Sequence, residues 1–291
     1  MKFKKIMKEI WRTICYPLMY MGMQFVVGII GAILISAAVM VSETIKGLLT
    51  TEGIAEKAMN VCTENVILLT LISNVITLFL MWIILRREWK SIKILKTVNA
   101  PVISLVACVL AGLPLSVFIG GSINLSGLLN IFPDYEQSMS NVLGNNLFLE
   151  ILCIGLIAPF IEEMIFRGTI LRRFKNFGIN MFLAIFVSSL LFGLMHISPV
   201  QVIYTFVLGI VFGAIYWRHD SIWPVTILHV AFNMVSIIMS NLPNGGDAET
   251  AAESPTSSMI IIILIAFLVS AGLLMLIMKK KKQIKSEEIL L

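Results

Sequence analysis

The strongest constraint in this sequence is a series of apolar runs, each about as long as a membrane-crossing helix. A helix needs roughly 20 apolar residues to cross a hydrocarbon layer about 30 Å thick. Eight such runs can be drawn, at 17–41, 66–85, 100–120, 147–171, 180–197, 200–217, 221–241 and 259–278. Only 13% of the residues are charged, about half the share usual for a soluble domain. We therefore expect an all-α fold, a polytopic membrane bundle of about eight transmembrane helices.

Lysine and arginine residues indicate which ends of these runs face the cytoplasm, because cytoplasmic loops retain them while acidic residues matter little. Lys46 and Lys57 are the only basic residues in the first connection, and 121–146, 198–199 and 242–258 have none. The other basic residues, apart from one inside the fourth run, gather in 2–12, 86–96, 172–175, 218 and 279–285. Eight spans with both termini in the cytoplasm satisfy this pattern, so we expect a multi-pass protein of the plasma membrane.

The same pattern divides the chain into five parts. Residues 1–14 alternate lysines with apolar side chains and predict a basic interfacial helix, with a plain basic tail as the alternative. Residues 15–146 hold the first three spans, and 147–240 hold spans four to seven. Residues 241–258 are acidic and contain Pro and Gly, which predicts an external linker. Residues 259–291 contain the last span and a basic cytoplasmic tail.

The basic residues also bear on partners. The formal net charge is +5, but the Lys and Arg residues sit in short clusters between apolar runs rather than in a nucleic-acid motif. We therefore expect the lipid bilayer as a partner and no nucleic acid.

Ionisable residues inside the apolar runs indicate where this protein carries out chemistry. Charged groups at membrane depth cost several kcal/mol unless they are paired or hydrated. Span four contains Glu162, Glu163 and Arg167. Glu163 and Arg167 are four residues apart, so we expect a structural ion pair on one helix face. Glu162 projects about 100° away from Glu163 and needs a partner on another helix.

Two further spans supply candidate partners. His196 ends span five, and His229 and Asn233 share one face of span seven. A single buried histidine is more often a structural residue, but Glu162, His196 and His229 could converge on one hydrated pocket. At about 1.5 Å per residue, Glu162 and His229 lie at similar depths, whereas His196 lies nearer the outer side unless span five stops early or tilts. His219 falls in a predicted cytoplasmic turn, where we expect solvent around it.

Three motifs taken together resemble those of one known family: Glu162-Glu163-x-x-x-Arg167, Phe192-x-x-x-His196 and His229-x-x-x-Asn233. They are similar to the CPBP family, the CAAX-protease and bacteriocin-processing intramembrane proteases once called the Abi family. The eukaryotic members are the type II CAAX prenyl endopeptidases. Each motif alone is weak, but three in the family's order form a specific signal. The resemblance covers roughly 147–240 and identifies that part as the predicted catalytic core.

The resemblance implies an intramembrane endopeptidase that cleaves a membrane-associated or lipidated protein or peptide. Hydrolysis of a peptide bond needs an activated water, stabilisation of the oxyanion and a proton for the leaving amine. In this interpretation Glu162 is the general base and His196 holds the water and shuttles the proton. His229 and Asn233 offer N–H donors to the oxyanion, and Glu163 and Arg167 give structural support.

The sequence leaves the cofactor open. A glutamate with two histidines can bind zinc, and Glu162, His196 and His229 would be its ligands. A metal-free glutamate mechanism resembles the prenyl endopeptidase branch, so we favour no cofactor, with zinc as the alternative. The four cysteines occur singly in different segments, which argues against a disulfide framework and a thiolate metal site.

Three other functions stay open. A non-catalytic immunity or scaffold protein of the same family would keep the motifs for assembly. An ion-coupled transporter would also hold Glu and His at membrane depth, but it would show inverted repeats, and no internal repeat is evident. A polar cluster could also serve only to join helices. The full set of Glu, His, His and Asn favours the peptidase.

Overall fold

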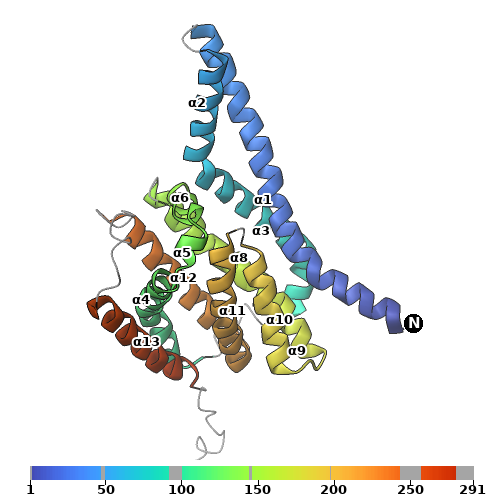
Figure 1. Cartoon of the computed structure of the whole chain (residues 1–291). Helices are drawn as coiled ribbons and strands as arrows, with labels where there is room; N and C mark the ends of the chain where they lie inside the picture. The colour runs from blue at the N-terminus through green and yellow to red at the C-terminus, as the bar shows by residue number, and fades with distance from the viewer. Residues whose placement is uncertain are drawn as a thin grey trace, which may run out of the picture.

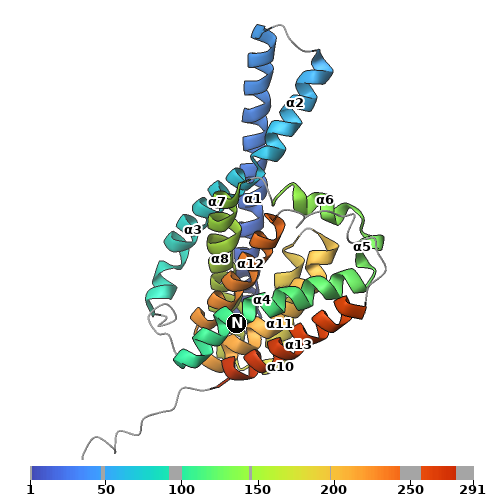
Figure 2. The ribbon, with the colours of Figure 1, turned by 90° about the vertical axis from the view of Figure 1, so that its left-hand side faces the viewer.

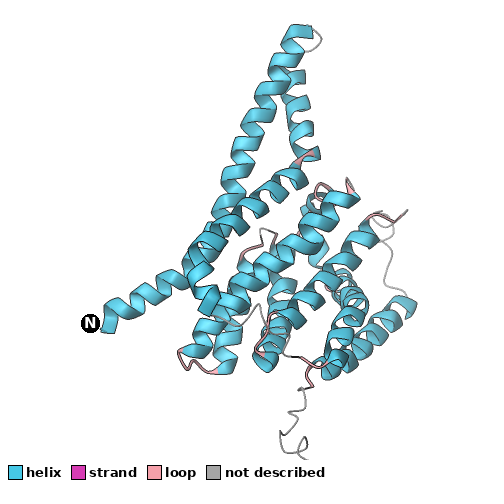
Figure 3. Ribbon diagram, turned by 180° about the vertical axis from the view of Figure 1, so that it is seen from behind, coloured by secondary structure: helices cyan, strands magenta, loops and turns pink. Residues whose placement is uncertain are grey.

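The computed structural model describes residues 2–46, 50–91, 100–143, 146–196, 198–242 and 257–279. Most of the predicted linker 241–258, and the predicted tail after residue 279, lie outside this part of the chain. Every regular element within it is helical, as Figure 3 shows, and none is a strand. The predicted all-α class is therefore confirmed.

The predicted spans coincide with helices. Six helices of the described residues are long and apolar enough to cross a membrane: α1 (Lys2–Lys46), α3 (Val66–Ser91), α4 (Val102–Leu125), α11 (Pro199–His219), α12 (Trp223–Ser240) and α13 (Ser257–Ile277). The fifth predicted span is α10 (Met181–Leu194), whose 14 residues cover only about 21 Å. The chain is thus a multi-pass integral membrane protein.

The fourth predicted span is a continuous helical stretch that is irregular in the middle. It consists of α7 (Leu147–Glu150), the π-helical segment η2 (Ile151–Ile157), α8 (Ala158–Ile165), the π-helical segment η3 (Phe166–Leu171) and α9 (Arg172–Asn176). Pro159 is the second residue of α8, and its ring crowds the carbonyl one turn earlier, which disfavours a regular α-turn there. A π-helical turn is closed by a hydrogen bond between residues i and i+5. Such turns are rare in proteins, and those that occur often lie at functional sites.

Three helices lie in connections where we predicted no structure. α2 (Thr51–Glu64) folds back along α1, and α5 (Leu128–Ile131) and α6 (Asp134–Ser140) lie between α4 and α7. Figures 1 and 2 show α1 and α2 rising together beyond the rest of the bundle. The buried carboxylate of Glu43 in α1 accepts a hydrogen bond of 2.7 Å from Lys57 of α2. This contact joins the two helices near their connection.

The N-terminal residues are part of α1 rather than a separate helix. α1 changes direction in its first third, as Figure 1 shows, and Pro17 lies inside it. Proline commonly bends a helix because it removes one hydrogen bond. The interfacial position of residues 1–14 stays a prediction.

Two apolar clusters hold the bundle together. One surrounds α8 and η3 and includes side chains of α1, α3 and α10. The other lies between α4, α11, α12 and α13. Close approach needs small residues here, since a Cβ on Gly112 of α4 would lie 2.6 Å from the carbonyl carbon of Ala231 in α12. Packing through small residues is typical of helices in membranes.

The two ends of the bundle differ in charge. The C-termini of α11 and α13 lie at the same end as α9, whereas α2, α5 and α6 lie at the other (Figure 1). At the basic end, Arg218 donates to the carbonyl of Met278 at 2.6 Å, and Nε2 of His219 lies 2.6 Å from the carbonyl of Ile277. His219 is buried, so our expectation of a solvated His219 was wrong. It binds a carbonyl at the end of α13 that has no partner within its own helix.

Accessibility of the two ends tests the predicted topology. Ser126, at the end of α4, and Asn176, at the end of α9, are exposed. We expect a membrane-impermeant maleimide added to intact cells to label Ser126→Cys, and to label Asn176→Cys only after permeabilisation. The parent protein with its own cysteines gives the background. Labelling of both variants from outside would contradict the topology.

Candidate functional site

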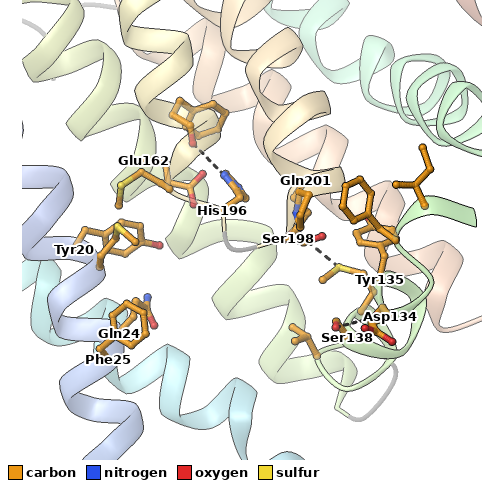
Figure 4. A pocket seen from close by; sticks show the side chains of 18 of the residues that line it. Tyr20, Gln24, Phe25, Asp134, Tyr135, Ser138, Glu162, His196, Ser198 and Gln201 are labelled. Atoms are coloured by element: carbon orange, nitrogen blue, oxygen red, sulfur yellow. Dashed lines mark hydrogen bonds between the residues drawn. The ribbon is translucent and has the colours of Figure 1, made fainter. Parts of the chain in front are cut away.

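A cavity of about 770 Å³ lies beside the middle of α8. Figure 4 shows side chains from α1, α6, α8 and the turn between α10 and α11 around it. Its volume falls within the range usual for ligand pockets. Its lining is mainly apolar, and the polar side chains among the lining residues are Tyr20, Gln24, Asp134, Tyr135, Ser138, Glu162, His196, Ser198 and Gln201.

Glu162 and His196 both line this cavity. Figure 4 labels both side chains among those around the cavity, Glu162 on α8 and His196 in the turn after α10. The difference in depth expected from the sequence does not prevent the two residues from lining one cavity, and His196 lies in the turn after α10, which ends at Leu194. The carbonyl of Phe192 accepts a hydrogen bond from Nδ1 of His196 at 3.1 Å. This bond leaves Nε2 of His196 as the nitrogen with a lone pair.

Glu163 points away from the cavity and binds two side chains. It has no exposed surface, and its Oε1 accepts hydrogen bonds from Nη1 of Arg167 at 2.9 Å and from Nδ1 of His229 at 3.0 Å. The predicted ion pair with Arg167 is therefore present. The bond to His229 was not predicted.

His229 connects the two neighbouring carboxylates. Its Nδ1 binds Glu163, and its Nε2 lies 3.7 Å from Oε2 of Glu162. His229 is 5% exposed and is not among the residues that line the cavity. It stands behind Glu162, where it can orient and stabilise that carboxylate. A hydrogen bond to one ring nitrogen fixes the role of the other.

Aromatic rings enclose the guanidinium of Arg167. Its central carbon lies 4.6 Å from the ring centre of Phe192 and 5.4 Å from that of Phe212. Its Nη2 also donates to the carbonyl of Gly209 in α11 at 3.1 Å. Cation–π contacts are stronger when the cation is shielded from water. The arginine thus ties η3 to α10 and α11.

Asn233 has a different place from the one we predicted. It is not among the lining residues, and its Nδ2 donates to the carbonyl of Ile154 at 2.9 Å. In a π turn, the carbonyl of Ile154 would accept from residue 159. That residue is Pro159, which has no N–H. Asn233 therefore satisfies a carbonyl that the helix cannot, and its predicted role toward an oxyanion is not supported by its position.

The predicted zinc ligands do not form a metal site in this arrangement. Within the described part of the chain, no three His, Cys, Asp or Glu side chains are grouped so that they could hold one ion. The Nδ1 atoms of His196 and His229 bind the Phe192 carbonyl and Glu163, so only their Nε2 atoms could bind a metal. Metal dependence stays a prediction to be tested.

Residues that we did not predict form part of the lining of the cavity. Tyr20 and Gln24 come from α1, and Gln24 donates to Oδ1 of Asn74 in α3 at 2.7 Å. Polar residues four apart in an apolar run share a helix face, so this pair was visible in the sequence. Asp134 and Tyr135 come from α6, in a connection that gave no helical signal.

Comparisons with known proteins agree with the motif analysis. Residues 144–235 match the family model described as "Type II CAAX prenyl endopeptidase Rce1-like". "Putative membrane peptidase YdiL" of Bacillus subtilis (strain 168) is 30% identical over 95 residues, which are 33% of this chain and 38% of that protein. The match thus spans well under half of the relative's length. No solved structure matches the chain. The resemblance to the CPBP family is confirmed over the segment that holds all three motifs.

The buried ion pair makes a prediction for stability. Removing one member of a buried pair leaves the other charge without compensation, which costs roughly 3–5 kcal/mol. We expect Arg167→Met and Glu163→Gln each to lower the thermal unfolding temperature of the purified protein, and the double substitution to recover part of the loss.

Lys175→Met is the matched control for this measurement. It breaks an ion pair with Asp220 in which both side chains are partly exposed, and such pairs contribute about 0–1 kcal/mol. If Arg167→Met unfolded at the same temperature as Lys175→Met, the pair would not have the structural role assigned to it.

Proposed function

We propose that this protein is an intramembrane endopeptidase that hydrolyses a peptide bond of a membrane-associated protein or peptide, with Glu162 as the general base. The observation that carries the proposal is that Glu162 and His196 both line one cavity of about 770 Å³. The family match over 144–235 supports a CAAX-type membrane protease.

Glu162 is the carboxylate free to act on water. Glu163 already accepts two hydrogen bonds and is fully buried, whereas the side chain of Glu162 is 14% exposed and lines the cavity. In the proposed reaction, Glu162 takes a proton from a water molecule as the water oxygen attacks the carbonyl carbon. The same proton then passes to the leaving amine when the C–N bond breaks. General bases contribute by holding the water in reach while they accept its proton.

The histidines have different tasks in this proposal. His196 holds the attacking water through Nε2, since its Nδ1 is bonded to the Phe192 carbonyl. His229 is held by Glu163 through Nδ1 and directs Nε2 toward Glu162. Asn233 supports the site by holding η2 in place.

Substitution of Glu162 tests the proposal directly. Glu162→Gln keeps the shape but removes the proton acceptor, so we expect turnover to fall by about 10²–10⁴ with unchanged abundance in the membrane. Comparing membrane and secreted peptidomes of cells with native or Glu162→Gln protein would identify the peptide whose length changes.

Glu136→Gln is the control, because Glu136 is exposed on α6 and does not line the cavity. If the native, Glu162→Gln and Glu136→Gln proteins gave the same peptidomes, a non-catalytic role for this fold would replace the peptidase.

Metal removal tests the proposed mechanism. We expect a strong chelator to leave most of the activity of the purified protein, because no three candidate ligand side chains in the described part of the chain are grouped around one position. Activity and bound metal should be measured before and after chelation. Stoichiometric zinc, with loss of activity and recovery specific to one metal, would reverse this assignment.

A further inference from the structure

The cavity is closed on the side of the basic residues. Below Glu162, all six residues of η3 (Phe166–Leu171) are buried, and α9 with Arg172, Arg173 and Lys175 follows directly. At about 1.5 Å per residue, Glu162 lies about 15 Å from Arg172. A buried layer that contains Phe166, Ile170 and Leu171 fills part of this distance. A substrate therefore has no open route along α8 from the basic end.

The cavity extends toward the opposite end of the bundle. Its outer lining comes from α6 and from the start of α11, through Asp134, Ser138, Ser198 and Pro199. Figure 1 places α5 and α6 at the end opposite α9. On the facing side, Tyr20 and Phe25 of α1 complete the wall, as Figure 4 shows. The open part of the cavity thus lies between α1 and α6.

Charge separates the two ends in the same way, apart from Lys46 and Lys57 at the far end of α1 and α2. No Lys or Arg is among the residues that line the cavity. From 97 to 278, the only basic residues are Arg167, which is buried, and the cluster at 172–175 with Arg218. Since basic loops stay in the cytoplasm, the end that carries α6 is the non-cytoplasmic one.

We propose that the substrate reaches Glu162 from the non-cytoplasmic side of the membrane, between α1 and α6. The substrate class is then a peptide segment exposed outside the cytoplasm, such as an exported peptide or the outer flank of a membrane span. A tail displayed in the cytoplasm does not meet the opening. The inference rests on the proposed peptidase function for its substrate, and on geometry and charge alone for the side of entry.

Chemical blocking of the opening tests the proposal. Ser138 lines the cavity on α6 and is exposed, so we expect Ser138→Cys to react with an impermeant maleimide on intact cells. A bulky polyethylene glycol maleimide at this position should then reduce cleavage of the peptide identified with Glu162→Gln by at least about tenfold. Activity is compared before and after modification of the same variant.

Ser126→Cys is the matched control, because Ser126 is exposed at the same end of the bundle but does not line the cavity. It should label equally from outside and retain cleavage after modification. Asn176→Cys, at the basic end, should label only after permeabilisation.

Two results would overturn the proposal. Labelling of Ser138→Cys only after permeabilisation would place the opening in the cytoplasm, whether or not the protein cleaves peptides. Full modification of Ser138→Cys with unchanged cleavage would exclude entry between α1 and α6. A native protein that cleaves nothing would refute the proposed function instead, while the labelling result would still decide which side the cavity faces.

Discussion

A buried negative charge, the carboxylate of Glu163, is the constraint on which the rest of the site depends. A charge without solvent needs partners that supply both opposite charge and hydrogen bonds. Arg167 and His229 supply them, and Arg167 also reaches the carbonyl of Gly209. One carboxylate therefore fixes the relative positions of α8, η3, α11 and α12. Because Glu163 is used in this way, its neighbour Glu162 is left facing the cavity.

Local rules in the sequence explain much of this arrangement. The apolar runs predict the helices, and the spacing of Glu163 and Arg167 predicts their ion pair, since both depend on helix geometry alone. The bond between Glu163 and His229 joins residues 66 apart in the sequence, and no local pattern predicts it. The helix α6 was missed because it is short and lies in a connection without apolar periodicity. His219 was misplaced because its partner is a carbonyl of α13, far along the chain.

The cavity combines two parts of the chain with different origins. Glu162, His196 and His229 lie within the segment 144–235 that matches the family model. Tyr20, Gln24 and the residues of α6 lie outside it. The chemistry of the site is thus supplied by one segment and most of its outer walls by another. Differences in substrate choice among proteins that share the segment can arise in α1 and α6 without any change in the reacting groups.

The π-helical segment η2 has a consequence for the two glutamates. A π turn accommodates one residue more than an α-turn, and each residue advances a helix by about 100°. If 151–157 formed a regular α-helix instead, the side chains of α8 would therefore be rotated by about 100°, which corresponds to one residue. Ile161 would then take the direction that Glu162 has now, and Glu162 would take the direction of Glu163. The hydrogen bond from Asn233 to the carbonyl of Ile154 stabilises the extra residue, and so a side chain on α12 helps to decide whether Glu162 faces the cavity.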